Sequence, residues 1–174
     1  KNTYEVVVSN LVGFEDGSIH FFGDFMYYAT PCAEKNYKGE VLYNRTTFMR
    51  YDLVNREKHE IYTTKQNDKE ETITYSYYVV GNSLYLAVYE ANNKTITSLK
   101  IDDEVETKYV IKDVVSCVMS ENNGLSTTEG KDVDANNYIY YTRSPIVDLS
   151  KGTVELPQEG VRVYRVSPSK NNSK

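Results

Sequence analysis

The sequence is poor in the residues that most compact sites depend on. It has no Trp, only two Cys and only two His in 174 residues. Cys32 and Cys117 are too few and too far apart for a disulfide framework, and isolated cysteines are usually small buried residues. His20 and His59 have no Cys or carboxylate at metal-ligand spacing. From these residues we predict neither a metal site nor a cofactor.

Familiar catalytic motifs are also missing. The chain has no GxSxG, no HExxH, no CxxC and no phosphate-binding glycine loop. Two carboxylates can be brought together by folding, as in glycosidases, but 25 acidic residues single out no pair. We therefore expect a protein that is not an enzyme and keep a hydrolase as an alternative.

Charge and hydropathy limit the partners. The net charge is -5 and the pI about 5.1, and such a surface repels phosphate backbones, so nucleic acid is not expected. No apolar run approaches the roughly 20 residues that span a bilayer, so no transmembrane segment is expected. The first residue is Lys1 and not Met, so a missing leader says nothing about location.

Tyrosine is abundant, with 17 copies, and hydrophobic residues make up 40% of the chain. Tyrosine favours strands and tolerates one wet edge. Apolar residues recur with period 2 or in short runs bounded by Gly, Asn and Asp, while helical spacing is nearly absent. The sequence predicts an all-β protein.

A short pattern occurs three times. A turn pair precedes an aromatic strand in each copy: Gly23-Asp24 before Tyr27, Gly81-Asn82 before Tyr85, and Asn136-Asn137 before Tyr140. Such pairs supply the positive φ of a type I′ turn. Each copy is therefore predicted to be a hairpin, with one strand before the turn and one after it.

Third and fourth strands follow the hairpins. The predicted third strands share an apolar-cation-apolar pattern before a polar turn, in Met49–Asp52, Leu99–Asp102 and Tyr164–Ser167. The predicted fourth strands are 59–64 and 107–113, and the third copy has none. A similar strand, TYEVVVSN at 3–10, stands alone.

These elements predict three four-stranded antiparallel units. Their ranges are about 18–64, 74–113 and 114–168, with the strand 3–10 as the twelfth. They form one predicted domain, 1–168, followed by a polar tail, 169–174.

The motifs "YIYYTRSP … VRVYRVSPS" and "FMYYATP … FMRYDLVN" resemble the tyrosine-rich β-propeller blades of secreted or surface-anchored bacterial proteins, some of them lipoproteins. The resemblance covers residues 4 to 168. It implies propeller-like units and an extracellular or cell-surface location.

Three units cannot ring an axis, because propellers have four to eight blades. Either the chain is part of a longer one, or a homodimer completes the ring through the strand at 3–10. A β-sandwich is the alternative fold.

Two long loops follow the aromatic strands, at 30–46 and 143–160. Long loops often carry function. Their candidate binding residues are Tyr37, Tyr43, Arg45 and Arg143, which suit a glycan or protein ligand. These loops could equally be surface hairpins without a partner.

Asp132, Asp134 and Asn136 alternate like the first half of a calcium loop. No Gly follows at the sixth position and Arg143 stands where a bidentate Glu is needed, so a solvated loop is favoured.

The sequence thus favours a non-catalytic binding or scaffold module. One alternative is a carbohydrate-active hydrolase with its site in the loops 30–46 and 143–160. The other is an assembly subunit that completes a sheet with a second chain.

Overall fold

The structure is a computed structural model that describes residues 4–9, 11, 19–32, 34–42, 45–65, 73–119, 138–144, 147–148, 153–154 and 162–170. The chain forms two compact units, Lys1–Glu71 and Thr72–Lys174, and each is described by itself. That residues 1–168 act as one domain stays a prediction.

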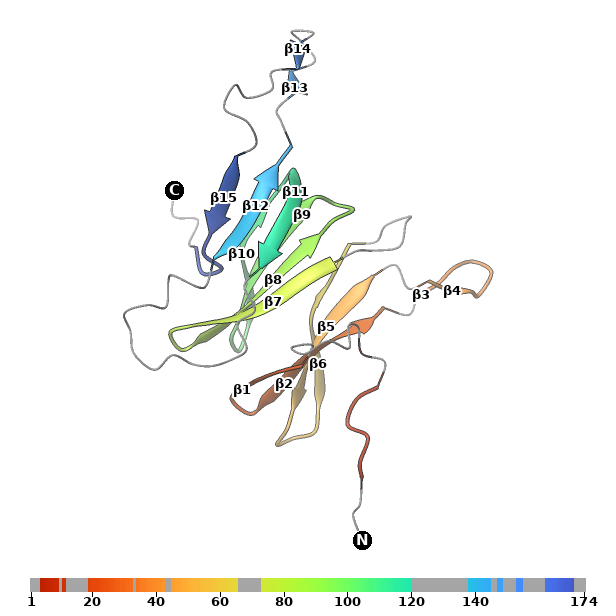
Figure 1. Ribbon diagram of the computed structural model, residues 1–174. Helices are drawn as coiled ribbons and strands as arrows, with labels where there is room; N and C mark the ends of the chain where they lie inside the picture. The colour runs from red at the N-terminus through yellow and green to blue at the C-terminus, as the bar shows by residue number, and fades with distance from the viewer. Residues whose placement is uncertain are drawn as a thin grey trace. The chain divides into compact units, whose positions relative to one another are not determined.

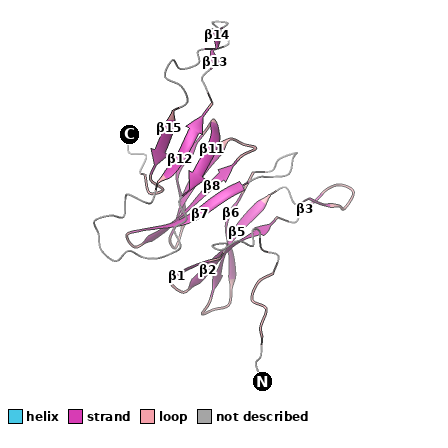
Figure 2. Ribbon diagram, viewed as in Figure 1, coloured by secondary structure: helices cyan, strands magenta, loops and turns pink. Residues whose placement is uncertain are grey.

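The regular secondary structure of the described part of the chain consists of strands joined by turns and loops (Figure 2). It contains no helix, so none there is long and apolar enough to cross a membrane. The predicted all-β class is confirmed. The sheets are antiparallel and open, and the described residues close neither a barrel nor a propeller.

The first unit holds one four-stranded sheet, of order β1-β2-β5-β6 (Figure 1). Its strands are β1 His20–Phe22, β2 Phe25–Pro31, β5 Thr46–Asp52 and β6 Lys58–Thr63. A two-stranded hairpin, β3 Glu34–Lys35 and β4 Val41–Leu42, lies within the connection from β2 to β5.

The second unit holds two sheets (Figure 1). The four-stranded sheet consists of β7 Ile73–Val80, β8 Ser83–Glu90, β9 Thr95–Ile101 and β10 Val105–Ile111 in sequential order. The three-stranded sheet consists of β11 Val114–Met119, β12 Ile139–Arg143 and β15 Val163–Val166. A hairpin of β13 Val147–Asp148 and β14 Thr153–Val154 lies between β12 and β15.

Strand register shows that the three sheets repeat one another. A tyrosine of the second strand lies opposite a cation of the third in every sheet: Tyr27 with Arg50, Tyr85 with Lys100, and Tyr140 with Arg165. Paired residues project from the same face of a sheet. The cation is held over an aromatic ring in two sheets, with Arg50 4.9 Å from the centroid of Phe25 and Arg165 4.5 Å from that of Tyr138.

The fourth strands repeat as well, down to an irregularity. Ile61 is an extra residue in the ladder of β6 with β5, because Tyr62 pairs with Phe48 while Glu60 pairs with Met49. Lys108 is the extra residue at the equivalent place in β10. A bulge inserts one residue and bends the strand, so both outer strands bend at the same point.

The first two predicted hairpins are confirmed, but their turn type was wrong. Gly23 and Gly81 have φ of 58° and 61°, whereas Asp24 and Asn82 are not among the residues with positive φ. Positive φ at the first central residue alone is typical of a type II′ turn, in which glycine occupies that position. The third pair, Asn136-Asn137, lies outside the described residues.

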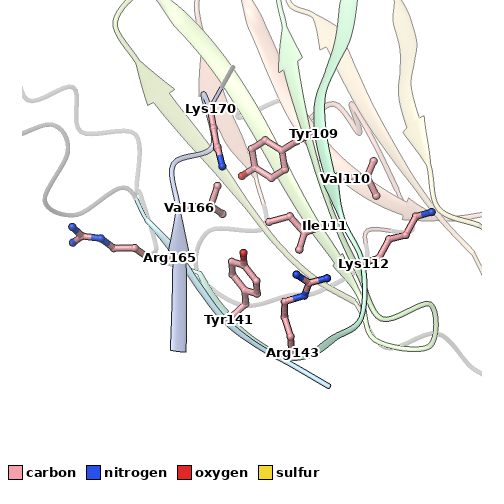
Figure 3. A pocket seen from close by; sticks show the side chains of 9 residues that line it. All are labelled: Tyr109, Val110, Ile111, Lys112, Tyr141, Arg143, Arg165, Val166 and Lys170. Atoms are coloured by element: carbon pink, nitrogen blue, oxygen red, sulfur yellow. The ribbon is translucent and has the colours of Figure 1, made fainter. Parts of the chain in front are cut away.

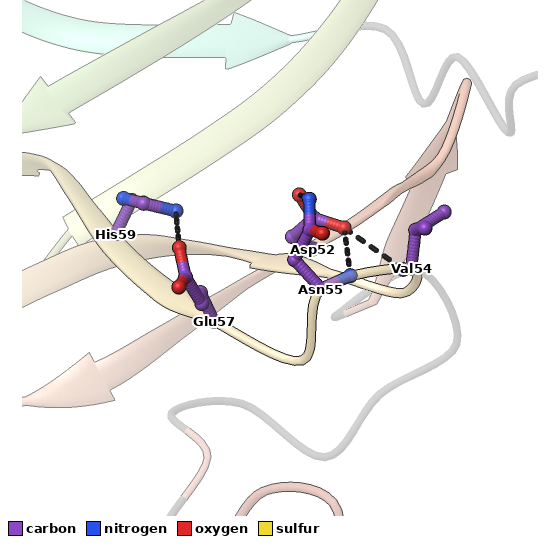
Figure 4. A network of polar contacts seen from close by, with 5 residues as sticks. All are labelled: Asp52, Val54, Asn55, Glu57 and His59. Carbon is purple, nitrogen blue, oxygen red and sulfur yellow. Dashed lines mark hydrogen bonds and ion pairs between the residues drawn. The ribbon is translucent and has the colours of Figure 1, made fainter.

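The turn from β5 to β6 is organised by Asp52 (Figure 4). Its carboxylate accepts hydrogen bonds from the backbone N–H groups of Val54 and Asn55 and from the Asn55 side chain, each at 2.8 Å. The Asn55 bonds are the main cause that lowers the pKa of Asp52 below its usual range. His59 Nε2 lies 3.7 Å from a Glu57 carboxylate oxygen in the same turn. The predicted third strand therefore does end in a polar turn.

One core joins the two sheets of the second unit. Tyr78, Tyr89 and Ile96 of the four-stranded sheet pack with Ile139 and Val166 of the three-stranded sheet. The two sheets therefore lie face to face.

Two hydroxyl groups also tie these sheets together. The Tyr89 hydroxyl donates to the carbonyl oxygen of Val115 at 2.9 Å. The Ser98 hydroxyl donates to the carbonyl oxygen of Pro168 at 2.7 Å. The second bond fixes the turn that follows β15 against β9.

The predicted strand at 3–10 is not formed where the structure describes it. Residues 4–9 pair with no described strand, and Tyr4 and Val6 are exposed. A strand needs a ladder partner for its backbone groups. Glu5 forms an exposed ion pair with Arg56, at 3.7 Å.

Candidate functional site

The candidate site is a hollow of about 420 Å³ in the second unit. It lies where β10 faces β12 and β15. Tyr109 and Ile111 of β10 form one wall, and Tyr141 and Arg143 of β12 form another. We call it the cationic hollow, because Arg143 and Lys170 contribute positive charge and no described residue of its lining is Asp or Glu.

The inward groups come together from distant parts of the chain (Figure 3). Arg143 is the last residue of β12, whereas Lys170 belongs to the turn after β15. In the view of Figure 3 the hydroxyl of Tyr109 points toward the Lys170 amine, and the hydroxyl of Tyr141 points into the same space. Two cations and two phenol groups thus share one cavity.

Other cations stand at its rim. Figure 3 shows the side chains of Lys112 and Arg165 directed away from the hollow. For Arg165 the cause is strand parity, because it pairs with Tyr140 and projects from the opposite face to Tyr141. These two charges raise the local potential without entering the cavity.

Burial governs the chemistry of the two phenols. Tyr109 is 5% exposed, and burial raises its pKa well above the usual range, although the nearby Ser98 hydroxyl lowers it somewhat. Burial also raises the pKa of Tyr141, and Arg143 lowers it in part. Both phenols are therefore neutral at physiological pH and can donate hydrogen bonds.

The Tyr109 hydroxyl has spare capacity for a ligand. It makes no hydrogen bond of good geometry within the described residues, and the Ser98 hydroxyl is already committed to the Pro168 carbonyl oxygen. A buried donor without a partner carries a free-energy cost of about 1 to 3 kcal/mol. A bound acceptor would remove that cost.

One carboxylate borders the site. Asp113 lies 3.8 Å from an Arg143 nitrogen, and both side chains are substantially exposed. An exposed pair of this kind is worth little, because water screens it. Arg143 therefore keeps donors for a further anion.

Of the predicted binding residues, Arg143 lies in this hollow. Tyr37 lies in the other unit, at the exposed tip of the β3–β4 hairpin, with the Lys38 amine 5.6 Å from its ring centroid. Arg45 lies at the end of the same loop, where its Nε donates a hydrogen bond to the Thr64 carbonyl oxygen at 3.0 Å. This bond connects the start of β5 to the end of β6. Tyr43 lies outside the described residues.

The predicted loops are not structureless. Each contains a short hairpin, β3–β4 in 30–46 and β13–β14 in 143–160. The first is fixed by Asn36, whose side-chain oxygen accepts from the backbone of Lys38 and of Glu40. The predicted calcium residues, Asp132, Asp134 and Asn136, lie outside the described residues.

Sequence reasoning missed Tyr109, Tyr141 and Lys170. Tyr109 and Tyr141 were assigned to scaffold strands, and Lys170 to a polar tail. Alternation along a strand shows only which side chains of that strand share a face, and no local pattern could show that β10 and β12 face each other. In the part of the chain described, no three His, Cys, Asp or Glu side chains gather as a metal site.

Comparisons of the chain with protein-family models, with curated proteins and with solved structures gave no match.

Proposed function

We propose that this chain is a non-catalytic binding module built of propeller-like repeats, and that the cationic hollow binds an acidic saccharide. The observation that carries the proposal is the convergence of Arg143 and Lys170 with the hydroxyls of Tyr109 and Tyr141 (Figure 3). The resemblance of the repeats to secreted bacterial blades supports a place outside the cell.

The chemistry favours an oxyanion. An arginine presents a planar fork that matches a carboxylate or sulfate, and a lysine adds a point charge. The neutral phenol groups add hydrogen-bond donors that carry no negative charge and so do not repel an anion. A volume of about 420 Å³ lies in the range of small-molecule sites.

The sugar part of the ligand is argued from the rings and the apolar wall. Tyr141 stacks on Tyr164 with ring centroids 5.4 Å apart, so the ring is held rigidly beside the cavity. Ile111 and Val166 give the wall an apolar surface. Such a site suits a ring that has one apolar face and one charged group.

A hydrolase is the weaker reading of this hollow. Glycoside hydrolysis requires two carboxyl groups about 5 to 9.5 Å apart across the scissile bond. The described lining offers cations and phenols instead. We therefore assign binding, and no reaction, to the hollow.

The test is calorimetric titration with a short oligogalacturonate, a neutral oligogalactose of equal length, and inorganic sulfate. We expect the acidic sugar to bind, the neutral one not to bind, and affinity to fall with added salt. The double variant Arg143→Gln with Lys170→Gln should lose at least tenfold in affinity, and the matched control Lys58→Gln should not.

Equal binding of the neutral sugar would refute recognition of the charge. Unchanged affinity in the double variant would refute this site. Binding of sulfate alone would show an anion site without a saccharide site, and would overturn the proposed ligand class.

A further inference from the structure

Within the described residues, the three-stranded sheet has no fourth strand, whereas the two four-stranded sheets do. In the other two sheets the third strand is covered by a fourth, β6 beside β5 and β10 beside β9. No described residue pairs with the outer edge of β15. An unpaired edge is a template for another strand.

The outer face of the same sheet is also uncovered. Val118, Tyr140 and Val163 project from it and are 69%, 40% and 68% exposed. Their register equivalents in the four-stranded sheet are Tyr78, Tyr85 and Ser98, which are all buried. The equivalent positions are thus buried in the four-stranded sheet, on which the three-stranded sheet packs, and exposed in the three-stranded sheet.

We propose that a second copy of this chain fills both places, inserting its N-terminal segment 4–9 beside β15 and packing its first sheet on the exposed face. The inference concerns a surface other than the cationic hollow and does not rest on the proposed function.

The order of the chain identifies the inserted strand. Just as β6 precedes β7 and β10 precedes β11, the segment 4–9 precedes β1. In the order of the repeat, the segment therefore corresponds to the fourth strand of a sheet that would precede the sheet β1-β2-β5-β6. The three-stranded sheet of another copy is a sheet with that strand missing.

Side-chain pattern sets the register. TYEVVVS at 3–9 aligns with KHEIYTT at 58–64, which contains β6, and this puts Val6 at the bulge and Val7 at the place of Tyr62. By the pairing of β5 with β6, Val7 then lies opposite Val163, and Glu5 lies opposite Tyr164. Tyr4 lies opposite Arg165, an aromatic-cation pair like those inside the sheets.

The segment is suited to move into this place. Tyr4 and Val6 are 92% and 82% exposed, so their burial against a partner is favourable. The segment forms no ladder with the described residues of its own chain, so none of these has to be broken. Its ion pair between Glu5 and Arg56 is exposed and therefore weak.

Cross-linking between two populations tests the contact and the register. In a background of Cys32→Ser and Cys117→Ala, one population carries Val7→Cys and the other Val163→Cys. Directly opposite residues have Cα atoms about 4.5 to 5.5 Å apart, within reach of a disulfide. We expect a disulfide-linked dimer only when the two are mixed, and none when Ser9→Cys replaces Val7→Cys.

A monomeric chain carrying both Val7→Cys and Val163→Cys separates the remaining outcomes. A disulfide within one chain would overturn the proposal, since the segment would then fill its own sheet. The absence of any disulfide in the mixture would overturn it as well.

Mass in solution gives the second test, which does not depend on cysteine. Two chains of 20.0 kDa each should elute as a species of about twice that mass, and dilution should dissociate it. Val118→Lys adds a charge to the exposed face and should give monomers. Val54→Lys, at an equally exposed turn position (69%), should leave the dimer intact. A concentration-independent monomer in the unmodified chain would refute the inference.

Discussion

Tyr27 lies directly opposite Arg50 in the ladder of β2 with β5. The same relationship joins Tyr140 to Arg165 in a sheet of the other unit, more than a hundred residues along the chain. Equal register across separate sheets shows that the tyrosine-rich pattern is a structural repeat. It also defines which positions are equivalent, and the predictions below use that equivalence.

Burial in the core of the second unit should dominate its stability. Ile139 is fully buried between the two sheets, so Ile139→Ala should lower the free energy of unfolding by about 2 to 5 kcal/mol. Val115 is on the same sheet but 55% exposed, and Val115→Ala should change the free energy of unfolding by no more than about 0.5 kcal/mol. Urea unfolding of both variants checks this, and equal losses would contradict the face-to-face packing.

The hydroxyl of Ser98 should contribute both to the stability of the protein and to anion binding. Ser98→Ala leaves the buried Pro168 carbonyl oxygen without its donor, which should destabilise the protein by about 1 to 3 kcal/mol. Because Lys170 follows in the same turn, the variant should also bind anions more weakly. The exposed Ser116, bonded to Thr142, is the control, and Ser116→Ala should alter neither quantity measurably.

The β7–β8 turn should require glycine. Gly81 has φ of 61° and open space around the position of a Cβ atom, so any cost of Gly81→Ala comes from backbone conformation. We expect a loss of about 1 to 2 kcal/mol in unfolding free energy. Asn82→Ala, in the same turn without positive φ, should cost less. The reverse order in chemical denaturation would refute the turn assignment.

Acid should weaken the first unit through Asp52. Its folded pKa is lowered, mainly by the Asn55 hydrogen bonds, so the carboxylate stabilises the fold above the unfolded pKa of about 3.9. That contribution disappears as pH falls through the folded pKa. Asp52→Asn should lower stability at pH 7 and flatten the acid limb between about pH 5 and pH 2. An unchanged acid limb in denaturant titrations would exclude this role.

Cys117 should resist alkylation. Burial raises its pKa to about 12, so thiolate is scarce at pH 8 compared with an unfolded cysteine of pKa about 8.5. In a Cys32→Ser variant, native Cys117 should react with iodoacetamide on the order of a thousandfold more slowly than in urea. Native and unfolded rates within tenfold of each other would show that the thiol is accessible and ionised.

Much of the fold was predictable from the sequence, because its determinants are local. Alternation, the glycine turns and the apolar-cation-apolar strands predicted β1, β2, β5 to β12 and β15. The turn type was wrong because Gly-Asp and Gly-Asn fit two turn types, and the backbone angle of Asp24 decides between them. The strand at 3–10 was predicted from its pattern alone, but it has no described partner.

The site was predictable only in part, for the same physical reason. Arg143 stood out because it ends an aromatic strand and opens a long loop. Tyr109 and Lys170 carry no local sign of a shared function.

The sequence by itself determined which residues form strands, which strands are neighbours and which side chains share a face, because period-2 alternation and tight turns act over a few residues. Only the tertiary structure decided that β10 faces β12 and β15, that Tyr109 is buried beside Lys170, and that the face of Val118 is left uncovered. Those relations depend on how whole sheets pack, and packing is set by contacts between residues far apart in the chain.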